Sequence, residues 1–239
     1  MLLLASVTIL SSVVTPFLKT LQTQSLISSD WSGYGVSSNA MFPQPLVSSV
    51  SGSWTVPVVG VSSVEAFSAS WIGVGGQANG DNTLIQVGSE HDSISGQAVY
   101  SLWYEMLPAD SIVIQNIAVS PGDKISGAIT LLDANSDNWL ISIEDVTTGQ
   151  GFSQNFVYNS SRLSAEWILE RPTLNNQLST LATFGSITFT DAKAQIAATS
   201  GTISAFPNYE ILMQNRQNTQ LVTVSALSKD GASFTVSNS

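Results

Sequence analysis

Short apolar segments, separated by turn-forming residues, follow one another through most of the chain. The segments are rich in β-branched and aromatic residues, and Gly, Pro, Asn and Asp are frequent between them. They lie at residues 54–59, 67–75, 83–89, 98–107, 112–120, 124–132, 138–146, 151–159, 164–170, 184–192, 209–213, 221–227 and 233–238. A spacing of about 8–12 residues is typical of antiparallel sandwiches and barrels. The pattern therefore predicts an all-β fold, in which only residues 164–181 or 191–198 leave room for a short helix.

Alternation within a segment predicts which side chains share a face of the sheet. Glu166 and Glu170 should lie on one face of their strand, and Trp167 on the other. At about 3.3 Å per residue, the two glutamates stand roughly 13 Å apart, too far for a direct carboxylate pair. By the same rule, Trp103 and Glu105 should share a face.

The N-terminal segment differs from the rest of the chain. Residues 1–18 carry no charged side chain, and Lys19 is the first. This stretch resembles the apolar core of a secretory signal or a short membrane anchor, although a basic leading region and a clear cleavage site are missing. A first strand of the fold is the alternative. We expect residues 1–24 to be a signal-like or anchor segment, residues 25–239 to be the folded domain, and the protein to be secreted.

Composition narrows the chemistry. The 239 residues include no cysteine and one histidine, His91, which excludes thiol catalysis, disulfides and any site that needs two imidazoles. Seven basic residues against 17 acidic ones argue against nucleic acid as a partner. Few carboxylates also favour acid tolerance, because acid unfolding comes largely from native carboxylates that must take up protons. Carboxylates, amides and hydroxyls would have to carry any catalysis without a cofactor.

Two polar residues stand in apolar or aromatic surroundings. Gln86 lies inside an apolar strand, where its amide must find partners or cost free energy. Glu105 follows Trp103 and Tyr104, so we expect it to be partly buried with a raised pKa. A structural glutamine bonded to the backbone and a solvated edge glutamate are the plainer interpretations.

The order of several motifs resembles that of the glutamic peptidases, the eqolisin family of acid-acting endopeptidases. No single motif is decisive, but their joint order and spacing are specific. The motifs run from Asp30 to Thr190 and are DWSG, WTVP, SWIGVGG, LIQVGSE, YSLWYEMLP, PGDKI, EDVTTGQ, AEWILERP and FGSITFTDA.

The resemblance implies a fold and a site. The fold would be a sandwich of two large antiparallel sheets, similar to legume lectins such as concanavalin. The catalytic glutamine of the family matches Gln86, and its catalytic glutamate matches Glu170 and not Glu166. Residues that shape the substrate-binding cleft would be Trp31, Trp71, Trp103 and Glu105.

This pair has a coherent chemistry. A carboxyl group with a pKa near the working pH can take a proton from water and return it to the leaving amine. A primary amide can orient the water and donate to the developing oxyanion without titrating. Glu170 would be general base and then acid, and no metal or cofactor would be needed. We expect a monomer that acts on proteins or peptides at acid pH, with Gln86 and Glu170 on neighbouring strands facing one groove.

Two positions depart from the family pattern. Gly75 and Gly76 stand where many members have an acidic residue, and Arg171 follows Glu170 where an acidic residue is common. On a strand, Arg171 should point to the opposite face from Glu170. If it instead reached Glu170, it would depress the pKa of that carboxyl.

Other features have plainer explanations. Asp133, Asn135, Asp137 and Glu144 follow calcium-loop spacing, but the flanking residues read as strands, so we expect an Asp/Asn-rich hairpin turn. His91 lies between Glu90 and Asp92, and we expect it in a surface loop with a raised pKa.

Two other functions remain open on the sequence alone. One is a non-catalytic lectin-like sandwich that binds carbohydrate or a cell-surface polymer through its aromatic residues. The other is a glycoside hydrolase that uses Glu105 and Glu170 as its two carboxyl groups.

Overall fold

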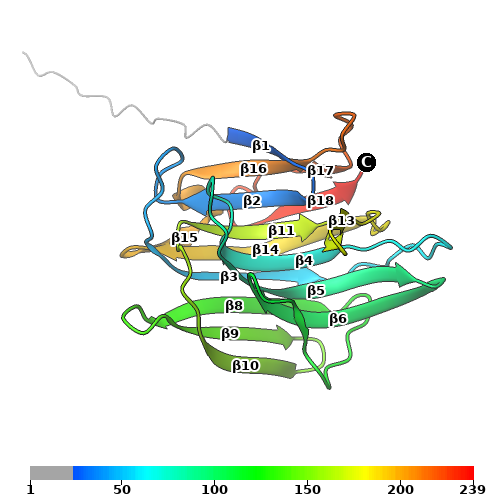
Figure 1. Cartoon of the computed structure of the whole chain (residues 1–239), viewed down its shortest axis with the longest axis horizontal. Helices are drawn as coiled ribbons and strands as arrows, with labels where there is room; N and C mark the ends of the chain where they lie inside the picture. Colours follow the sequence, from blue (N-terminus) through cyan, green and yellow to red (C-terminus); the bar gives the residue numbers. More distant parts are fainter. Residues whose placement is uncertain (1–23) are drawn as a thin grey trace, which may run out of the picture.

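Two large β-sheets stacked on each other form the body of the protein. The computed structural model describes residues 24–239, and Figure 1 shows the strands of both sheets running side by side across the molecule. The predicted all-β sandwich is confirmed. Residues 1–23, which hold nearly all of the predicted signal-like or anchor segment, lie outside the described residues. Within residues 24–239, no helix has the length and apolar character needed to cross a membrane.

Sheet A, the first of the two, carries most of the residues selected from the sequence. Only its edge pair, β1 with β16, is parallel among the pairs of this sheet in the described chain. In spatial order its strands are β1 (Gln24–Ser28), β16 (Asn208–Met213), β2 (Trp31–Ser37), β11 (Ser164–Glu170), β4 (Ala69–Gly75), β5 (Leu84–Ile94), β6 (Gln97–Met106) and β7 (Ile112–Val113).

Sheet B, the second, is antiparallel throughout its described pairs. In spatial order its strands are β10 (Gln150–Val157), β9 (Asn138–Asp145), β8 (Lys124–Asp133), β3 (Val47–Thr55), β14 (Ser186–Ile196), β18 (Phe234–Asn238) and β17 (Val222–Val224), with β15 (Thr199–Thr202) paired to β14. A small hairpin of β12 (Thr173–Leu174) and β13 (Gln177–Leu178) follows β11.

Neither segment with room for a helix contains one. Residues 164–181 contain β11 and the small hairpin, and residues 191–198 contain the end of β14, at Ile196, and the turn after it. The only helical element among residues 24–239 is a single 3₁₀ turn, Ile203–Ala205. In β14 a register shift after Thr190 interrupts the strand without ending it, which explains why its alternation is hard to follow in the sequence.

The main core lies between the sheets and is built by alternation. On β11, Ala165, Trp167 and Leu169 point into this core, on the face opposite to the two glutamates of the strand. Two buried tryptophans tie the sheets together through hydrogen bonds: the indole of Trp167 donates to the Ser51 carbonyl at 2.8 Å, and the indole of Trp54 donates to the Ser89 hydroxyl at 2.8 Å. Buried indole N–H groups need such partners.

A second, smaller apolar cluster lies on the outer face of sheet A. It contains residues that alternate with the main-core residues on the same strands, so a strand such as β4 or β11 is buried on both faces. Its buried members are Ala69, Trp71, Leu84, Trp103, Ile168, Tyr209 and Ile211.

The single histidine contradicts its prediction. His91 lies on β5, which extends to Ile94, and it is fully buried in the sandwich, where its Nε2 is 2.8 Å from the Ser89 hydroxyl. Burial lowers its pKa to about 3, so both the expected surface loop and the expected raised pKa are wrong. Asp92 points to the opposite face of β5, so the two do not form a triad with Ser89.

The Asp/Asn-rich turn is confirmed. It joins β8 to β9, and Asp133 accepts hydrogen bonds from the Asn135 backbone at 3.0 Å and the Ser136 hydroxyl at 2.7 Å. No group of three or more His, Asp or Glu side chains among residues 24–239 is arranged to hold a metal ion.

Candidate active site

Strand register brings the two main candidates to the same face of sheet A. On one line across the sheet, Glu105 of β6 pairs with Gln86 of β5, which pairs with Gly73 of β4. On another line, Ala69 of β4 pairs with Glu170 of β11. Residues an even number of positions apart share a face, so Gln86, Glu105 and Glu170 all lie on the outer face. They are not on neighbouring strands as expected, because β4 lies between β5 and β11.

Gln86 and Glu105 form a direct pair. The Gln86 side-chain N–H donates to Oε2 of Glu105 in a short hydrogen bond, while the Gln86 Oε1 is buried without a hydrogen-bond partner. Gln86 is 4% exposed. Leaving such an acceptor unsatisfied costs about 1–3 kcal/mol, a cost that native structures tend to concentrate at functional positions. Gln86 is therefore bonded to a side chain and not to the backbone, contrary to the plainer interpretation.

The pKa of Glu105 is raised, as its aromatic neighbours predicted. Burial is the main cause, the Gln86 hydrogen bond opposes it, and the charges of Asp110 and Glu90 add to the rise. Glu105 is therefore a partly buried carboxyl whose ionised form is stabilised chiefly by the amide of Gln86.

Glu170 lies among tryptophans at the end of β11. The indole N–H of Trp71 donates to its Oε2 at 2.7 Å, and Trp31 packs edge-on against Trp71 with ring centroids 4.9 Å apart. Burial raises the pKa of Glu170 to about 8; the hydrogen bonds from Trp71 and Trp31 lower it, and the charges of Asp30 and Glu105 raise it. The resting side chain therefore holds a proton at neutral and acid pH.

The four residues expected to shape the cleft differ in exposure. Trp71 is fully buried and Trp103 is 4% exposed, whereas Trp31 and Glu105 are half-buried. The indole N–H of Trp103 has no hydrogen-bond partner. Trp71 thus contacts Glu170 from a buried position. Trp31 and Glu105 expose more of their side chains to solvent.

Asp30 belongs to the site, although sequence reasoning gave it no role. Its carboxylate accepts a hydrogen bond from the Ser28 hydroxyl at 2.6 Å, and its charge raises the pKa of Glu170. The sequence feature that could have indicated this role is its position directly before Trp31, because Trp31 of β2 pairs with Glu170 of β11.

Glu166 lies on the same face as Glu170 but in a different environment. It is fully buried, and burial raises its pKa well above the ordinary value, with only partial compensation from the Ser164 hydroxyl. On the line across the sheet it pairs with Gly35 of β2, and Gly35 pairs with Tyr209 of β16. The alternation prediction for Glu166 and Glu170 is confirmed, and only Glu170 has tryptophan partners.

Arg171 does not depress the pKa of Glu170, because it is absent from the groups that shift it. Its guanidinium Nη2 donates to the Ser29 carbonyl at 2.8 Å, and its backbone N–H donates to the Asp30 carbonyl at 2.8 Å. The side chain is held at the end of the strand, beside the site.

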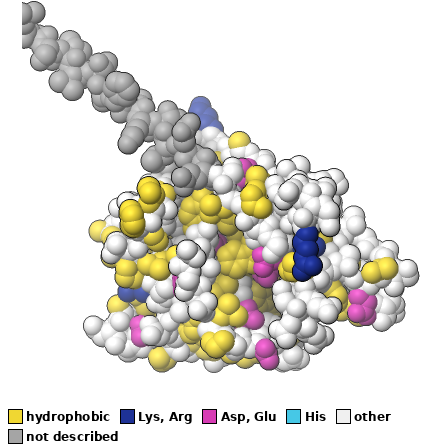
Figure 2. All heavy atoms as spheres, turned by 45° about the horizontal axis from the view of Figure 1, so that its top comes forward, with side chains coloured by type: hydrophobic (Ala, Val, Ile, Leu, Met, Phe, Trp, Pro, Cys, Tyr) yellow, Lys and Arg dark blue, Asp and Glu magenta, His cyan; other side chains and the backbone are white. Residues whose placement is uncertain are grey.

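The surface around these residues has a distinct character. A hollow of about 290 Å³ on the outer face of sheet A is lined in part by Asp30, Trp31, Gly76 and Gln77. Figure 2 shows a face on which hydrophobic and acidic side chains gather while Lys and Arg are few. Such a surface can hold an uncharged peptide segment against apolar side chains and present carboxyl groups to it.

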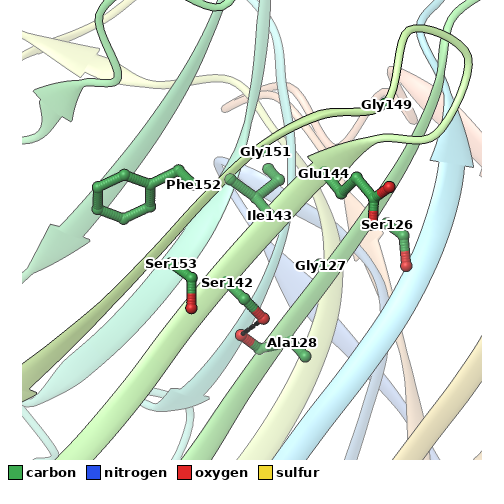
Figure 3. A pocket seen from close by; sticks show the side chains of 10 residues that line it. All are labelled: Ser126, Gly127, Ala128, Ser142, Ile143, Glu144, Gly149, Gly151, Phe152 and Ser153. Carbon is green, nitrogen blue, oxygen red and sulfur yellow. Dashed lines mark hydrogen bonds between the residues drawn. The ribbon is translucent and has the colours of Figure 1, made fainter.

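Another hollow, of about 310 Å³, lies on the other side of the sandwich. Figure 3 shows it over β8, β9 and β10, with Glu144, Ser126, Ser142 and Ser153 among its lining residues. None of the candidate catalytic or cleft residues lines it; these are Gln86, Glu170, Trp31, Trp71, Trp103 and Glu105. The chemistry predicted from the sequence is therefore confined to sheet A.

Fold and site together define a class: a two-sheet β-sandwich with an amide–carboxyl pair and a buried carboxyl on one sheet face. Residues 29–237 match the Peptidase A4 family, and the chain belongs to this family. The family is that of the glutamic peptidases, or eqolisins, which are hydrolases, so the resemblance seen in the sequence motifs is confirmed.

Individual relatives agree with this assignment. The chain is 30% identical to aspergillopepsin-2 of Aspergillus niger over 177 residues, which make up 72% of this chain and 60% of that protein. It therefore spans less than two thirds of the length of this relative.

Solved structures establish the shared fold. Scytalido-glutamic peptidase with a transition-state analogue inhibitor aligns with a TM-score of 0.73 at 22% identity, over 89% of this chain and 99% of the other. SCP-B, an eqolisin in complex with the tripeptide Ala-Ile-His, aligns with a TM-score of 0.69 at 22% identity, over the same shares.

Proposed function

We propose that this protein is an acid-acting endopeptidase and that Gln86 and Glu170 carry its reaction. The observation that supports this most directly is the placement of a protonated, tryptophan-bound carboxyl and an amide–carboxyl pair on one face of a sheet. The substrates would be proteins or peptides, and family membership supports this class.

The raised pKa of Glu170 changes the order of proton transfers expected from the sequence. A carboxyl with a pKa of about 8 is protonated in acid, so it enters the cycle as a proton donor. Glu105 is the proposed proton acceptor: burial raises its pKa too, but it is bonded to the amide of Gln86, whose N–H stabilises the ionised form. Two carboxyl groups in different surroundings can divide acid and base roles in this way.

The proposed step balances in atoms and protons. A water oxygen bonds to the carbonyl carbon of the peptide while one of its protons moves to Glu105. The proton of Glu170 moves to the peptide nitrogen, the C–N bond breaks, and the amine and the carboxylic acid leave. Transfer of a proton from Glu105 to Glu170, through solvent, restores the starting state. Gln86 holds Glu105, and its unpartnered Oε1 is the atom left to orient the water.

Digestion of a denatured protein at a series of pH values tests the proposal. Glu170→Gln should abolish digestion at every pH, and Gln86→Ala should reduce it at least about 100-fold, the usual cost of losing a catalytic group of this kind. Glu105→Gln separates two orders of transfer: it should be as damaging as Glu170→Gln if Glu105 is the base, and mildly damaging if Glu170 performs both transfers. Glu144→Gln, on the outer face of sheet B, is the matched control and should leave the rate unchanged.

The folded state must be checked for each variant. Glu170→Gln removes a buried ionisable group, so its stability should be unchanged or higher. Full digestion by a folded Glu170→Gln variant would contradict the mechanism. A folded wild-type protein that cleaves nothing at any pH but binds oligosaccharide would favour the lectin-like alternative.

We also propose export for this protein. The support is the uncharged apolar stretch of residues 1–18. Expression of the full chain in a secreting host, followed by N-terminal sequencing of the protein in the medium, tests it. Recovery of the protein only inside the cells would contradict it.

A further inference from the structure

A groove with two arginines lies beside the candidate site. It has a volume of about 610 Å³ and is formed where the β12–β13 hairpin meets the turn after β16. We call it the arginine groove; the residues that define it here are Arg171, Arg216, Asn176, Gln177, Asn215 and Gln217. The whole sequence has seven basic residues, so two in one groove set this place apart from the rest of the molecule.

The arginine groove adjoins Glu170 through the chain. Arg171 follows Glu170, which places their Cα atoms about 3.8 Å apart. Arg171 is fixed by the bond of its Nη2 to the Ser29 carbonyl, and its Nε is buried with no hydrogen-bond partner. Arg216, in contrast, is exposed and lies in the turn after β16. Arg171 is therefore held in place at the end of the groove next to Glu170, and the exposed Arg216 is accessible to a ligand.

The charge of the surroundings determines what this groove can attract. The chain has a formal net charge of −10, and Asp30, Glu90 and Glu105 lie on or near the site face. A substrate carboxylate is repelled by these groups wherever they are ionised. The arginine groove offers the opposite: guanidinium N–H groups that match a carboxylate, and side-chain amides that can donate further hydrogen bonds.

We propose that the arginine groove binds a carboxylate of the peptide substrate and so sets a cleavage preference. The carboxylate belongs to an Asp or Glu side chain or to the C-terminus of the peptide. This inference rests on the proposed peptidase function and adds a substrate class to it.

The test compares matched peptides at about pH 5, where a free Glu side chain is mostly ionised. The parent is a neutral peptide, amidated at its C-terminus, that the wild-type protein cleaves at one bond. One set replaces a single neutral residue by Glu or Gln at successive positions on either side of that bond. A second set compares a free C-terminal acid with the amide at successive distances from the bond. The readout is the ratio of kcat/KM for the charged and uncharged member of each pair.

We expect the wild-type ratio to reach about five- to tenfold at one position, the size of effect that one charge-assisted contact gives at a partly exposed site. The set in which the gain appears identifies the source of the carboxylate. Arg216→Gln should return that ratio to about one, Arg216→Lys should keep part of the gain, and high salt should reduce it. Lys193→Gln, an exposed residue on β14 in sheet B, removes the same charge elsewhere and should leave the ratio unchanged.

Several results would overturn the inference. A wild-type ratio near one at every position rejects the arginine groove while leaving the peptidase proposal intact. A gain that survives in folded Arg216→Gln and Arg171→Gln variants rejects these residues as its cause. Failure of the wild-type protein to cleave any peptide rejects both proposals together.

Discussion

At the scale of single residues, the state of Glu170 depends on the indole that faces it. Burial is the main cause that raises its pKa to about 8, and the Trp71 hydrogen bond is the main cause that opposes the rise. Trp71 is itself fully buried, so its position is fixed by packing and not by solvent. The tryptophans near the site therefore tune a carboxyl group as well as providing apolar surface.

Replacement of Trp71 by Phe should raise the pKa of Glu170, because the Trp71 N–H stabilises the ionised form. The alkaline limb of the pH–rate profile should move to higher pH, with a lower maximal rate. Trp54→Phe is the matched control, since Trp54 also donates a buried hydrogen bond but to Ser89 in the main core. If the alkaline limb of the pH–rate profile moved equally in both variants, the limb would depend on the stability of the fold and not on the ionisation of Glu170.

Some residues could be assigned from the sequence and others could not, for physical reasons. The burial of Glu105 and the shared face of Glu166 and Glu170 follow from neighbours and alternation, which are local. The burial of His91 does not, because it depends on β5 continuing past Glu90 and on sheet B covering that face. The contact between Gln86 and Glu105 likewise requires the register of β5 with β6.

At the scale of elements, β4 and β5 approach each other closely beside the site. A Cβ added at Gly88 would lie 2.4 Å from the Ser70 carbonyl oxygen and 2.6 Å from the Cβ of Trp71. Only glycine fits without movement of backbone, so this residue sets the spacing that lets Trp71 reach Glu170.

Gly88→Ala should therefore lower both stability and activity. Overpacking of this kind costs about 1–3 kcal/mol, and the displaced Trp71 would no longer be aligned with Glu170. Urea unfolding and kcat/KM on one peptide measure the two effects. Gly151→Ala on the edge strand β10 is the control, since an added Cβ there comes no closer than 3.3 Å to its neighbours, and it should change both quantities little.

Strand prediction failed where polar residues occupy one face. Most of β3, Val47–Thr55, was missed before Trp54, because its sequence VSSVSGSWT alternates serines with few apolar residues. The predicted strand at residues 112–120 is a strand only at Ile112–Val113. Apolar content is a poor guide to the strand boundaries of both segments, because strand formation there depends on whether a neighbouring strand is available for pairing.

At the scale of the whole molecule, buried acids make the fold sensitive to rising pH. Burial raises the pKa of Asp92 to about 7, that of Glu170 to about 8 and that of Glu166 well above its ordinary value. Below the ordinary pKa the folded and unfolded forms are both protonated. As pH rises, the unfolded form releases its protons first and gains stability relative to the folded form. His91 acts in the opposite sense, because its pKa is lowered to about 3.

The stability of the wild-type protein should fall between about pH 4 and pH 8, since the raised acids outnumber the one histidine. Asp92→Asn should reduce the loss of unfolding free energy that occurs between pH 3.8, the ordinary pKa, and about pH 7, by up to about 4 kcal/mol. Urea unfolding at several pH values measures it, with exposed Asp191→Asn as control. An unchanged pH dependence in Asp92→Asn would contradict the assignment. The loss of stability above neutrality would also confine activity to acid solution, although Glu170 itself keeps its proton to about pH 8.

The alternation of faces along β5 and β11 has a consequence for how this protein can change over generations. Each of these strands carries site residues and main-core residues at alternate positions, so inserting or deleting one residue within a strand would exchange the two sets. Substitutions can alter the site one side chain at a time, whereas changes in chain length are tolerable only in the connecting turns. Natural variation and directed evolution of this protein should therefore show indels between the strands and none inside them.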